Sequence, residues 1–259
     1  MKKAVIAAFA LATALTCALQ ARESVVIVGA HPDDLIGCAG TAFRLREKFD
    51  IHLVDFTHGE RGLGEEKFRS GYTKATRTRE ETEACELLGA KLHWLDEVDG
   101  EAHAGRETCE RLAAILKELK PRAVIAHWPV DVHTDHVMAG AAAIRAIFLA
   151  GIKPEIYFME QTYQSKRFVP DVLVDISSVY DKVWESLRLY ACQYRDGGME
   201  RRRRASADFY GWHSANYYRA KAEGFMSFVQ PMQGERTIFT DLPHPKPETT
   251  RLNFQGARP

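Results

Sequence analysis

Val25-Val26-Ile27-Val28-Gly29-Ala30-His31-Pro32-Asp33-Asp34 is the stretch of this 259-residue chain that decides its fold. The apolar residues favour a buried strand, and the residues after Gly29 place an imidazole and two carboxylates at the end of that strand. His133-Thr134-Asp135-His136 repeats the arrangement just past a second apolar run at 123–126. Imidazole and carboxylate groups delivered by two strand ends are the ingredients of a hydrolytic metal site.

The rest of the chain alternates strand-like and helix-like segments. Further strands are predicted at 51–57, 91–95, 123–126, 155–159 and 172–176, and helices at 37–49, 73–88, 107–119, 135–149 and 179–192. This rhythm predicts a Rossmann-like α/β/α fold of three layers with a mostly parallel sheet. Ligands of such folds bind outside the carboxyl ends of the strands, which is where both His/Asp motifs fall.

The bulk composition fits one globular domain and no polyanionic partner. A chain of 259 residues is long enough to bury a sizeable core. Lys plus Arg and Asp plus Glu both number 35, so no overall field attracts the protein to nucleic acid or to an anionic membrane. We therefore expect a small-molecule or glycan substrate and no nucleic-acid partner.

Residues 1–21 have the layout of a secretory signal peptide. Met1-Lys2-Lys3 is a short basic region, and an uncharged apolar stretch and small residues follow it. The apolar stretch is too short to serve comfortably as a permanent membrane span. We expect export to the periplasm or the extracellular space, one domain over 22–230, and an irregular tail at 231–259.

Four cysteines follow the predicted signal peptide: Cys38, Cys85, Cys109 and Cys192. None has a CxxC spacing, and three full pairings are open. An exported location permits a disulfide without requiring one.

The two motifs suit a catalytic zinc ion, which accepts imidazole nitrogen and carboxylate oxygen and keeps one position for water. His31 and Asp34 lie three residues apart on a tight turn that Pro32 stiffens, so both side chains can reach one point. Asp33 is left without a ligand role and is close enough to accept a proton from the bound water. The second motif supplies a third ligand and one more histidine.

The chain resembles the LmbE-like (PIG-L) family of zinc-dependent N-acetylglucosamine deacetylases, whose first signature is a strand followed by Ala-His-Pro-Asp-Asp-Glu. The resemblance extends over nearly the whole chain after residue 21. The later elements that carry it are the loop at 55–62, the R-x-x-E helix and Leu-Gly turn at 77–90, the D-x-H-x-D-H motif at 131–136, and two weaker elements at 192–193 and 222–225.

The resemblance implies an LmbE-like fold and a zinc site made of His31, Asp34 and His136. It also implies that zinc-bound water is the nucleophile and that Asp33 is the general base. The chain departs from the family at Leu35, where a glutamate is usual. That loss alters the support behind the ligands but removes neither the proposed ligands nor the base.

The resemblance assigns further roles to polar residues around the motifs. His133 would stabilise the developing oxyanion or protonate the leaving amine, and Asp135 would orient His133. Glu60 and Arg61 are candidates to line the sugar pocket, as the family's loop does, with a solvated loop as the alternative. Arg79 is a candidate to contact the substrate, with a salt bridge along its helix as the alternative.

The basic run Arg201 to Arg204 allows two interpretations. A solvated loop is the simpler one, and we predict it. The other is a flexible lip that attracts an anionic sugar or glycolipid.

The sequence as a whole predicts a secreted zinc-dependent hydrolase that cleaves the acetyl amide of an N-acetylated amino sugar or its conjugate. Two alternatives remain open. One keeps the metal site but acts as an amidase on a sugar-thiol conjugate or a longer N-acyl chain. The other is a glycan-binding protein that catalyses no reaction, and the departure from the family at Leu35 is the reason to consider it.

Overall fold

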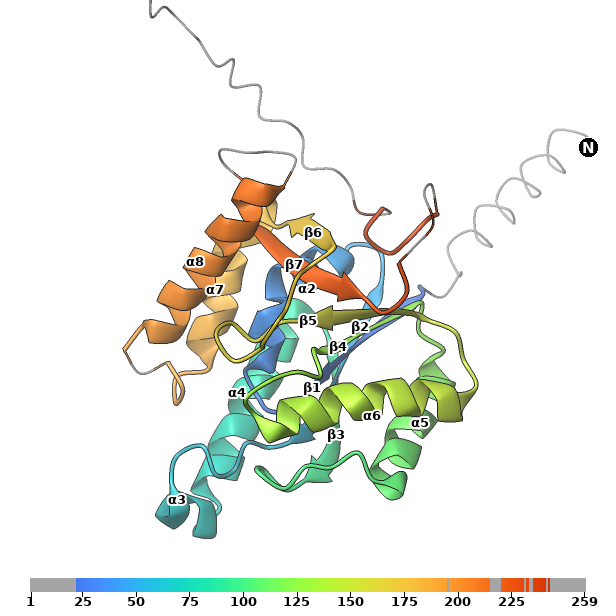
Figure 1. Cartoon of the computed structure of the whole chain (residues 1–259). Helices are drawn as coiled ribbons and strands as arrows, with labels where there is room; N and C mark the ends of the chain where they lie inside the picture. The colour runs from blue at the N-terminus through green and yellow to red at the C-terminus, as the bar shows by residue number, and fades with distance from the viewer. Residues whose placement is uncertain are drawn as a thin grey trace, which may run out of the picture.

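A seven-stranded sheet forms the centre of the computed structural model, which describes residues 22–194, 196–214, 220–230, 232, 235–240 and 242. The strand order is β3-β2-β1-β4-β5-β7-β6 (Figure 1). The strands are β1 (Ser24–Gly29), β2 (Asp50–Thr57), β3 (Lys91–Glu97), β4 (Ala123–His127), β5 (Glu155–Met159), β6 (Val172–Asp175) and β7 (Ala222–Ser227). Strands β1 to β5 are parallel, and β7 runs antiparallel to both of its neighbours.

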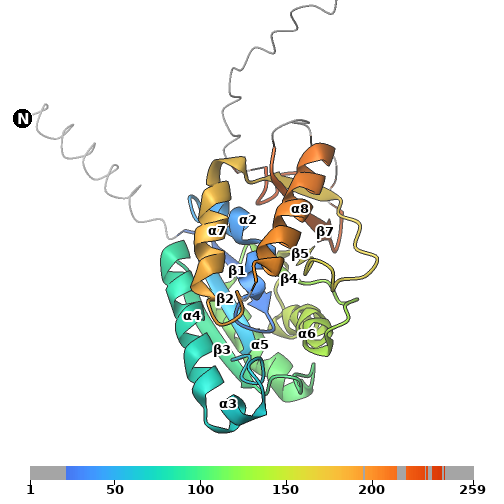
Figure 2. The same ribbon diagram turned by 90° about the vertical axis from the view of Figure 1, so that its left-hand side faces the viewer.

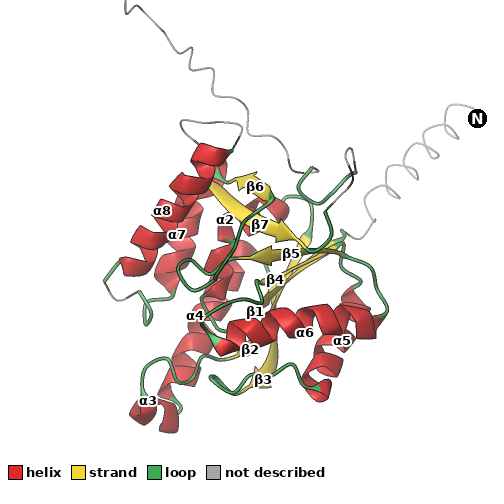
Figure 3. Ribbon diagram, viewed as in Figure 1, coloured by secondary structure: helices red, strands yellow, loops and turns green. Residues whose placement is uncertain are grey.

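Helices cover both faces of the sheet, as Figure 3 shows in red against yellow strands. They are α2 (Ala39–Leu45), α3 (Glu65–Arg69), α4 (Tyr72–Leu88), α5 (Arg106–Leu119), α6 (Thr134–Ala150), α7 (Tyr180–Leu189) and α8 (Gly198–His213), with short 3-10 turns η1 (Asp34–Gly37) and η2 (Ser177–Val179). The predicted three-layer α/β/α fold with a mostly parallel sheet is confirmed.

Alternate residues of β1 enter two different apolar cores, because successive side chains of a strand point to opposite faces. Val25 and Ile27 pack into the core shared with α2, α4 and α7, whereas Val26 and Val28 pack against α5 and α6. Figure 2 shows α4 and α7 on one side of the sheet and α6 on the other. Burial on both faces explains why β1 is apolar throughout.

The order of the strands brings the two His/Asp motifs together. β1 pairs with β2 on one side and with β4 on the other, so successive strands are added outward on one side of β1 as far as β3 and then on its other side from β4 onward. A crevice forms at the carboxyl ends of strands where the order reverses in this way. The residues after β1 and those after β4 meet at that crevice.

Three elements differ from the sequence prediction. Helix α3 lies between the predicted strand at 51–57 and the predicted helix at 73–88, where no element was predicted. β7 was not predicted because Ala222–Ser227 has no β-branched residue and includes Gly224. The basic run Arg201 to Arg204, predicted as a loop, lies in α8. Arginine is a good helix former, and Glu200 pairs with Arg204 one turn away, which favours a helix.

The ends of the chain lie largely outside the described residues. This applies to the predicted signal peptide at 1–21 and to most of the predicted tail at 231–259. The described tail residues form no helix or strand, yet Ile238 and Leu242 are buried in the core beside α2 and α7. Within the described residues, no helix has both the length and the apolar character needed to cross a membrane.

The cysteines that follow the predicted signal peptide are free thiols in the structure, and Cys192 is the most accessible of them. The other three are buried: Cys38, Cys85 and Cys109.

Gly140 allows α6 to approach β4 closely. A Cβ at this residue would lie 2.4 Å from the carbonyl oxygen of His127. We expect Gly140→Ala to lower the free energy of unfolding by about 1–3 kcal/mol, because the overlap outweighs the ~1 kcal/mol by which alanine is favoured over glycine inside a helix. Urea unfolding measures the change. Phe148→Ala, at an exposed position of α6, is the control and should shift the value by less than about 0.5 kcal/mol. Equal shifts in the two variants would contradict the packing argument.

Candidate active site

Asp34 is the residue around which the site is built. Its carboxylate folds back onto its own turn, where Oδ2 accepts the backbone N–H groups of Ala30 (2.9 Å) and His31 (2.8 Å). The same oxygen accepts a hydrogen bond from His127 Nε2 at 2.9 Å. Burial alone would raise the pKa of Asp34, but the imidazoles of His136 and His127 hold this pKa well below its ordinary value. Asp34 is therefore a buried carboxylate ion.

His31 lies between Asp34 and two further acids. Its Nδ1 lies 3.6 Å from Asp34 Oδ2, and its Nε2 lies 3.0 Å from Asp135 Oδ2 and 3.3 Å from Asp99 Oδ1. Burial lowers the pKa of His31, but the hydrogen bonds to these carboxylates outweigh it and raise the pKa well above its ordinary value. Because Nε2 donates to Asp135, Nδ1 is the nitrogen that can ligate a metal beside Asp34.

His136 reaches Asp34 from the first turn of α6. Its Nε2 lies 3.4 Å from Asp34 Oδ1, and its Nδ1 lies 3.2 Å from Asp131 Oδ1. Burial opposes protonation, but Asp34 and Asp131 raise the pKa of His136 to about 9. Each predicted imidazole ligand thus has one nitrogen toward Asp34 and the other on a separate acid. This is how proteins orient metal-ligating histidines.

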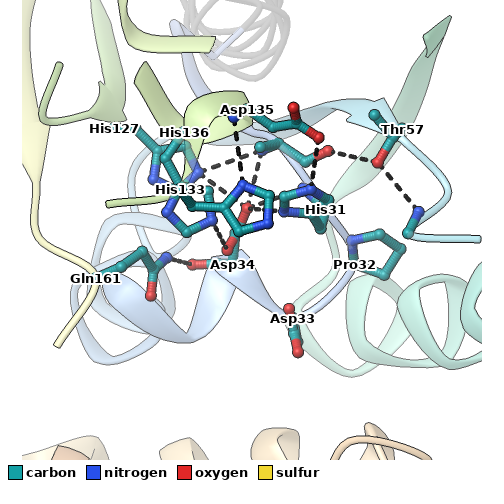
Figure 4. Close-up of polar contacts among 12 residues, drawn as sticks. His31, Pro32, Asp33, Asp34, Thr57, His127, His133, Asp135, His136 and Gln161 are labelled. Carbon is teal, nitrogen blue, oxygen red and sulfur yellow. Dashed lines mark hydrogen bonds and ion pairs between the residues drawn. The ribbon is translucent and has the colours of Figure 1, made fainter. Parts of the chain in front are cut away.

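The donor set fits a zinc-type ion. The ligand atoms of His31, His133 and His136 lie within 4.8 Å of one another, and so do those of Asp34, His127 and His136. Two groups that share His136 overlap at the crevice, as Figure 4 shows. Imidazole nitrogen with carboxylate oxygen is the donor combination of catalytic zinc sites.

His127 belongs to this cluster, although it lies outside both His/Asp motifs of the sequence. It is the last residue of β4, it is buried, and its ring stacks on that of His136 with centroids 4.3 Å apart. Burial lowers the pKa of His127, although the neighbouring carboxylate of Asp34 opposes the shift. The signal was available, because a polar residue that directly ends an apolar strand lies at the edge where ligands bind. The predicted strand stopped one residue short.

The structure corrects the predicted partner of Asp135. Its carboxylate accepts hydrogen bonds from His31 Nε2 and from the backbone N–H of Gly100 (2.7 Å), and among the described residues it forms no hydrogen bond with the ring of His133. His133 caps the N-terminus of α6, where its Nδ1 accepts the backbone N–H of Asp135 (3.3 Å). A capping side chain turns back onto its own helix, whereas Asp135 in the first turn points toward β1. Asp135 therefore orients His31.

Asp33 lies beside the cluster and lines the same cavity (Figure 4). Its backbone has φ +94°, a left-handed conformation that is uncommon for a residue with a side chain. Two residues of α4 hold the turn: Glu81 Oε2 accepts the Asp33 N–H at 3.0 Å, and Arg77 lies 3.1 Å from the Asp33 carboxylate. Burial raises the pKa of Asp33 to about 6, although Arg77 opposes the shift.

Buried carboxyl groups lie behind Asp33. No hydrogen-bond partner among the described residues reaches Glu81 Oε1 or either oxygen of Asp55. Burial raises the pKa of Glu81 to about 8, and burial is also the main reason why the pKa of Asp55 lies well above its ordinary value. Glu81 is thus mainly a neutral carboxyl group at pH 7 that still accepts the Asp33 N–H.

The cavity in front of these residues has a volume of about 410 Å³, within the range of small-molecule sites. Arg61 lines the cavity. Glu60 does not; it is buried behind the cavity, where Oε1 accepts the backbone N–H of Asp99. Arg79 also lies elsewhere, because it is on the solvent face of α4 and pairs with Glu83 at 3.7 Å. Leu35 is buried in the apolar core.

Glu81→Gln tests the neutral carboxyl. The pKa of Glu81 is about 8 in the folded protein and 4.5 in the unfolded chain, so the unfolded chain releases this proton at lower pH. The contribution of protonated Glu81 to the free energy of unfolding is therefore lost as the pH rises from 4.5 to 8. Glutamine keeps an acceptor for the Asp33 N–H but does not titrate. We expect the variant to lose less stability than the wild type between pH 5 and pH 8, by at least about 1 kcal/mol, in urea unfolding. Glu86→Gln, at an exposed position of the same helix, should leave the pH dependence unchanged. Parallel pH profiles for the wild type and Glu81→Gln would rule the shift out.

Comparisons with known proteins agree with the motifs. The PIG-L family model, described as GlcNAc-PI de-N-acetylase, matches residues 26–147. A 4-oxalmesaconate hydratase from Pseudomonas putida is 29% identical over 192 residues, which cover 66% of this chain and 74% of the hydratase. A probable N-acetyl-alpha-D-glucosaminyl L-malate deacetylase 2 from Bacillus subtilis is 27% identical over 190 residues, which cover 66% of this chain and 84% of the relative. The solved structure of N,N'-diacetylchitobiose deacetylase from Pyrococcus horikoshii superposes with a TM-score of 0.69 at 28% identity, over 80% of this chain and 84% of that one.

Both His/Asp motifs lie within the matched segment, and the resemblance that they indicated is confirmed. Over residues 26–147, which include both motifs, the chain is similar to the PIG-L (LmbE-like) family.

Proposed function

We propose that this protein is a zinc-dependent hydrolase that removes the acetyl group from an N-acetylated amino sugar or its conjugate. The observation that carries the proposal is the convergence of His31 and His136 on the carboxylate of Asp34, at the wall of a cavity that Asp33 also lines. The proposal includes export, which rests on residues 1–21 alone and which determination of the mature N-terminus would check.

His31, Asp34 and His136 would hold the zinc ion, with His127 beside them on the buried side. When bound, zinc supplies a Lewis acid that polarises the amide carbonyl and lowers the pKa of water toward ~7. The three acids behind the imidazoles keep the rings in place: Asp99, Asp131 and Asp135.

Asp33 is the residue suited to accept a proton. With a pKa of about 6 its carboxylate is mainly ionised at pH 7, yet it is basic enough to take a proton from an attacking water. Arg77 lies 3.1 Å away and fixes the orientation of the carboxylate. The left-handed turn at Asp33 points its side chain away from the ligand cluster, which leaves room for the reacting groups (Figure 4).

His133 is the residue suited to donate a hydrogen bond. Because its Nδ1 accepts the backbone N–H of Asp135, the neutral ring carries its hydrogen on Nε2. Burial, and then the nearby imidazoles, lower the pKa of His133, so the ring is neutral at pH 7. The Nε2–H group can then stabilise an oxyanion that forms at the carbonyl or pass a proton to the leaving amine.

Asp33→Asn separates the base from the metal site. We expect acetate release from N-acetylglucosamine compounds to fall at least about 100-fold, because a general base contributes that much. The zinc content, measured by mass spectrometry, should stay unchanged, whereas Asp34→Ala should lose the metal. Arg79→Ala, on the outer face of α4, is the control and should keep both properties. Full activity in Asp33→Asn would overturn the assignment of the base.

Hydration of an unsaturated acid is a second candidate function, because the hydratase relative is 29% identical over 66% of this chain. A hydratase also needs a positioned water and a base, so the site alone serves both reactions. We expect the zinc-loaded protein to release acetate from N-acetylglucosaminides and to leave the ultraviolet absorbance of 4-oxalmesaconate unchanged.

N-acyl substrates of increasing chain length test the amidase alternative. Binding of a glycan without any hydrolysis would favour the non-catalytic alternative.

A further inference from the structure

Four arginines line the cavity, and the protein itself engages three of them. The engaged arginines and their partners are Arg77 with Asp33 (3.1 Å), Arg61 with Glu101 (2.5 Å) and Arg203 with Gln161 (2.6 Å). Arg202 is the fourth, and no carboxylate among the described residues lies within 4.0 Å of its nitrogens. One guanidinium at the cavity therefore keeps its hydrogen-bond donors available to a ligand.

Arg202 is held in place by an aromatic ring instead of an acid. The carbon of its guanidinium lies 4.2 Å from the centroid of the Tyr163 ring, in cation–π geometry. Tyr163 also lines the cavity and has φ +71°, a conformation that costs of order 1 kcal/mol for a residue with a bulky side chain. Backbone strain of this kind persists where the surrounding structure imposes it, and it is concentrated at ligand sites.

The loop that carries Tyr163 is tied to the metal ligands. Ser165 donates its hydroxyl hydrogen to Asp131 Oδ2 at 2.8 Å, and Asp131 Oδ1 lies 3.2 Å from His136 Nδ1. Lys166 donates to the carbonyl oxygen of Tyr163 at 2.8 Å. The loop that holds the Tyr163 ring against Arg202 is thus hydrogen-bonded to the acid that contacts His136.

The adjacent arginine on α8 provides a contrast. Arg201 donates to the backbone oxygen of Asp196 at 2.9 Å and lies 3.8 Å from the Asp196 carboxylate. It does not line the cavity. Consecutive helical residues point about 100° apart, which separates these two otherwise equivalent side chains.

We propose that Arg202, stacked on Tyr163, binds an anionic group of the substrate, a carboxylate or a phosphate, at the part of the cavity away from the acetyl amide. The inference rests on the proposed function, because it places the acidic group on the same molecule as the acetylated sugar. The planar guanidinium offers a fork of donors that matches either anion, and stacking on the ring restricts the side chain before the ligand arrives. Arg202 is a specificity residue in this account and takes no part in the chemical step.

Binding tests the proposal most directly. Zinc-loaded protein with Asp33→Asn, which slows turnover at least about 100-fold, is titrated by calorimetry with three probes: N-acetylglucosamine 1-phosphate, an N-acetylglucosaminide of malate, and neutral methyl N-acetylglucosaminide. We expect Arg202→Gln to weaken at least one acidic probe about 10- to 100-fold, the usual loss for a hydrogen bond to a charged group, and to change the neutral probe by less than about twofold. The probe that is affected distinguishes phosphate from carboxylate. Arg202→Lys should restore part of the affinity, because lysine keeps the charge but not the fork.

Arg201→Gln is the matched control, since it removes the same charge from the next residue of the same helix. Equal losses on acidic and neutral probes, no loss on either acidic probe, or an equal loss in Arg201→Gln would overturn the inference. The wild type is assayed for acetate release in parallel. If Arg202→Gln weakens binding of an acidic probe but the wild type releases no acetate, the proposed function is wrong and the anion site is retained. If the wild type releases acetate but Arg202→Gln does not discriminate between acidic and neutral probes, the anion site is wrong and the proposed function is retained.

Discussion

The carboxylate of Asp34 is the group on which the rest of the site depends. It is buried, and it keeps its negative charge because two backbone N–H groups of its own turn and an imidazole at the end of β4 donate to it. The same anion therefore closes the turn after β1 and attaches that turn to the neighbouring strand. An uncompensated charge in such a place would be costly, so the imidazoles around it are a structural requirement as well as candidate ligands.

Imidazoles and carboxylates alternate outward from this anion. His31 and His136 each have one nitrogen toward Asp34 and the other on an acid, and the acid beyond His136 continues through Ser165 into the loop that carries Tyr163. On the opposite side, α4 holds Asp33 through a salt bridge and a backbone hydrogen bond. This connected network sets the geometry of the reacting groups, and most of its residues are positioned by another member of the network.

Much of the fold was predictable from local patterns. The runs that became β1, β2 and β4 are buried on both faces, and burial of that kind leaves a continuous apolar signal in the sequence. β7 left no such signal. It lies between β5 and β6 because it pairs with both strands, and its own residues do not form a strand-like pattern. The basic run in α8 suggested a loop by its charge, although its i,i+4 Glu–Arg pair favoured a helix. The described part of the tail is irregular, yet it contributes Ile238 to the core.

By itself the sequence determined which groups are delivered to the crevice: the turn with His31, Asp33 and Asp34, and the second motif that contains His136. These follow from strand ends and short spacings, which act over a few residues. Only the tertiary structure decided that Asp135 holds His31, that His127 joins the cluster, and that Arg202 and not Arg201 reaches the cavity. Those contacts join residues far apart in the chain or depend on the rotation of a helix about its axis. Strand order and core packing set both, and neither is encoded in a local pattern.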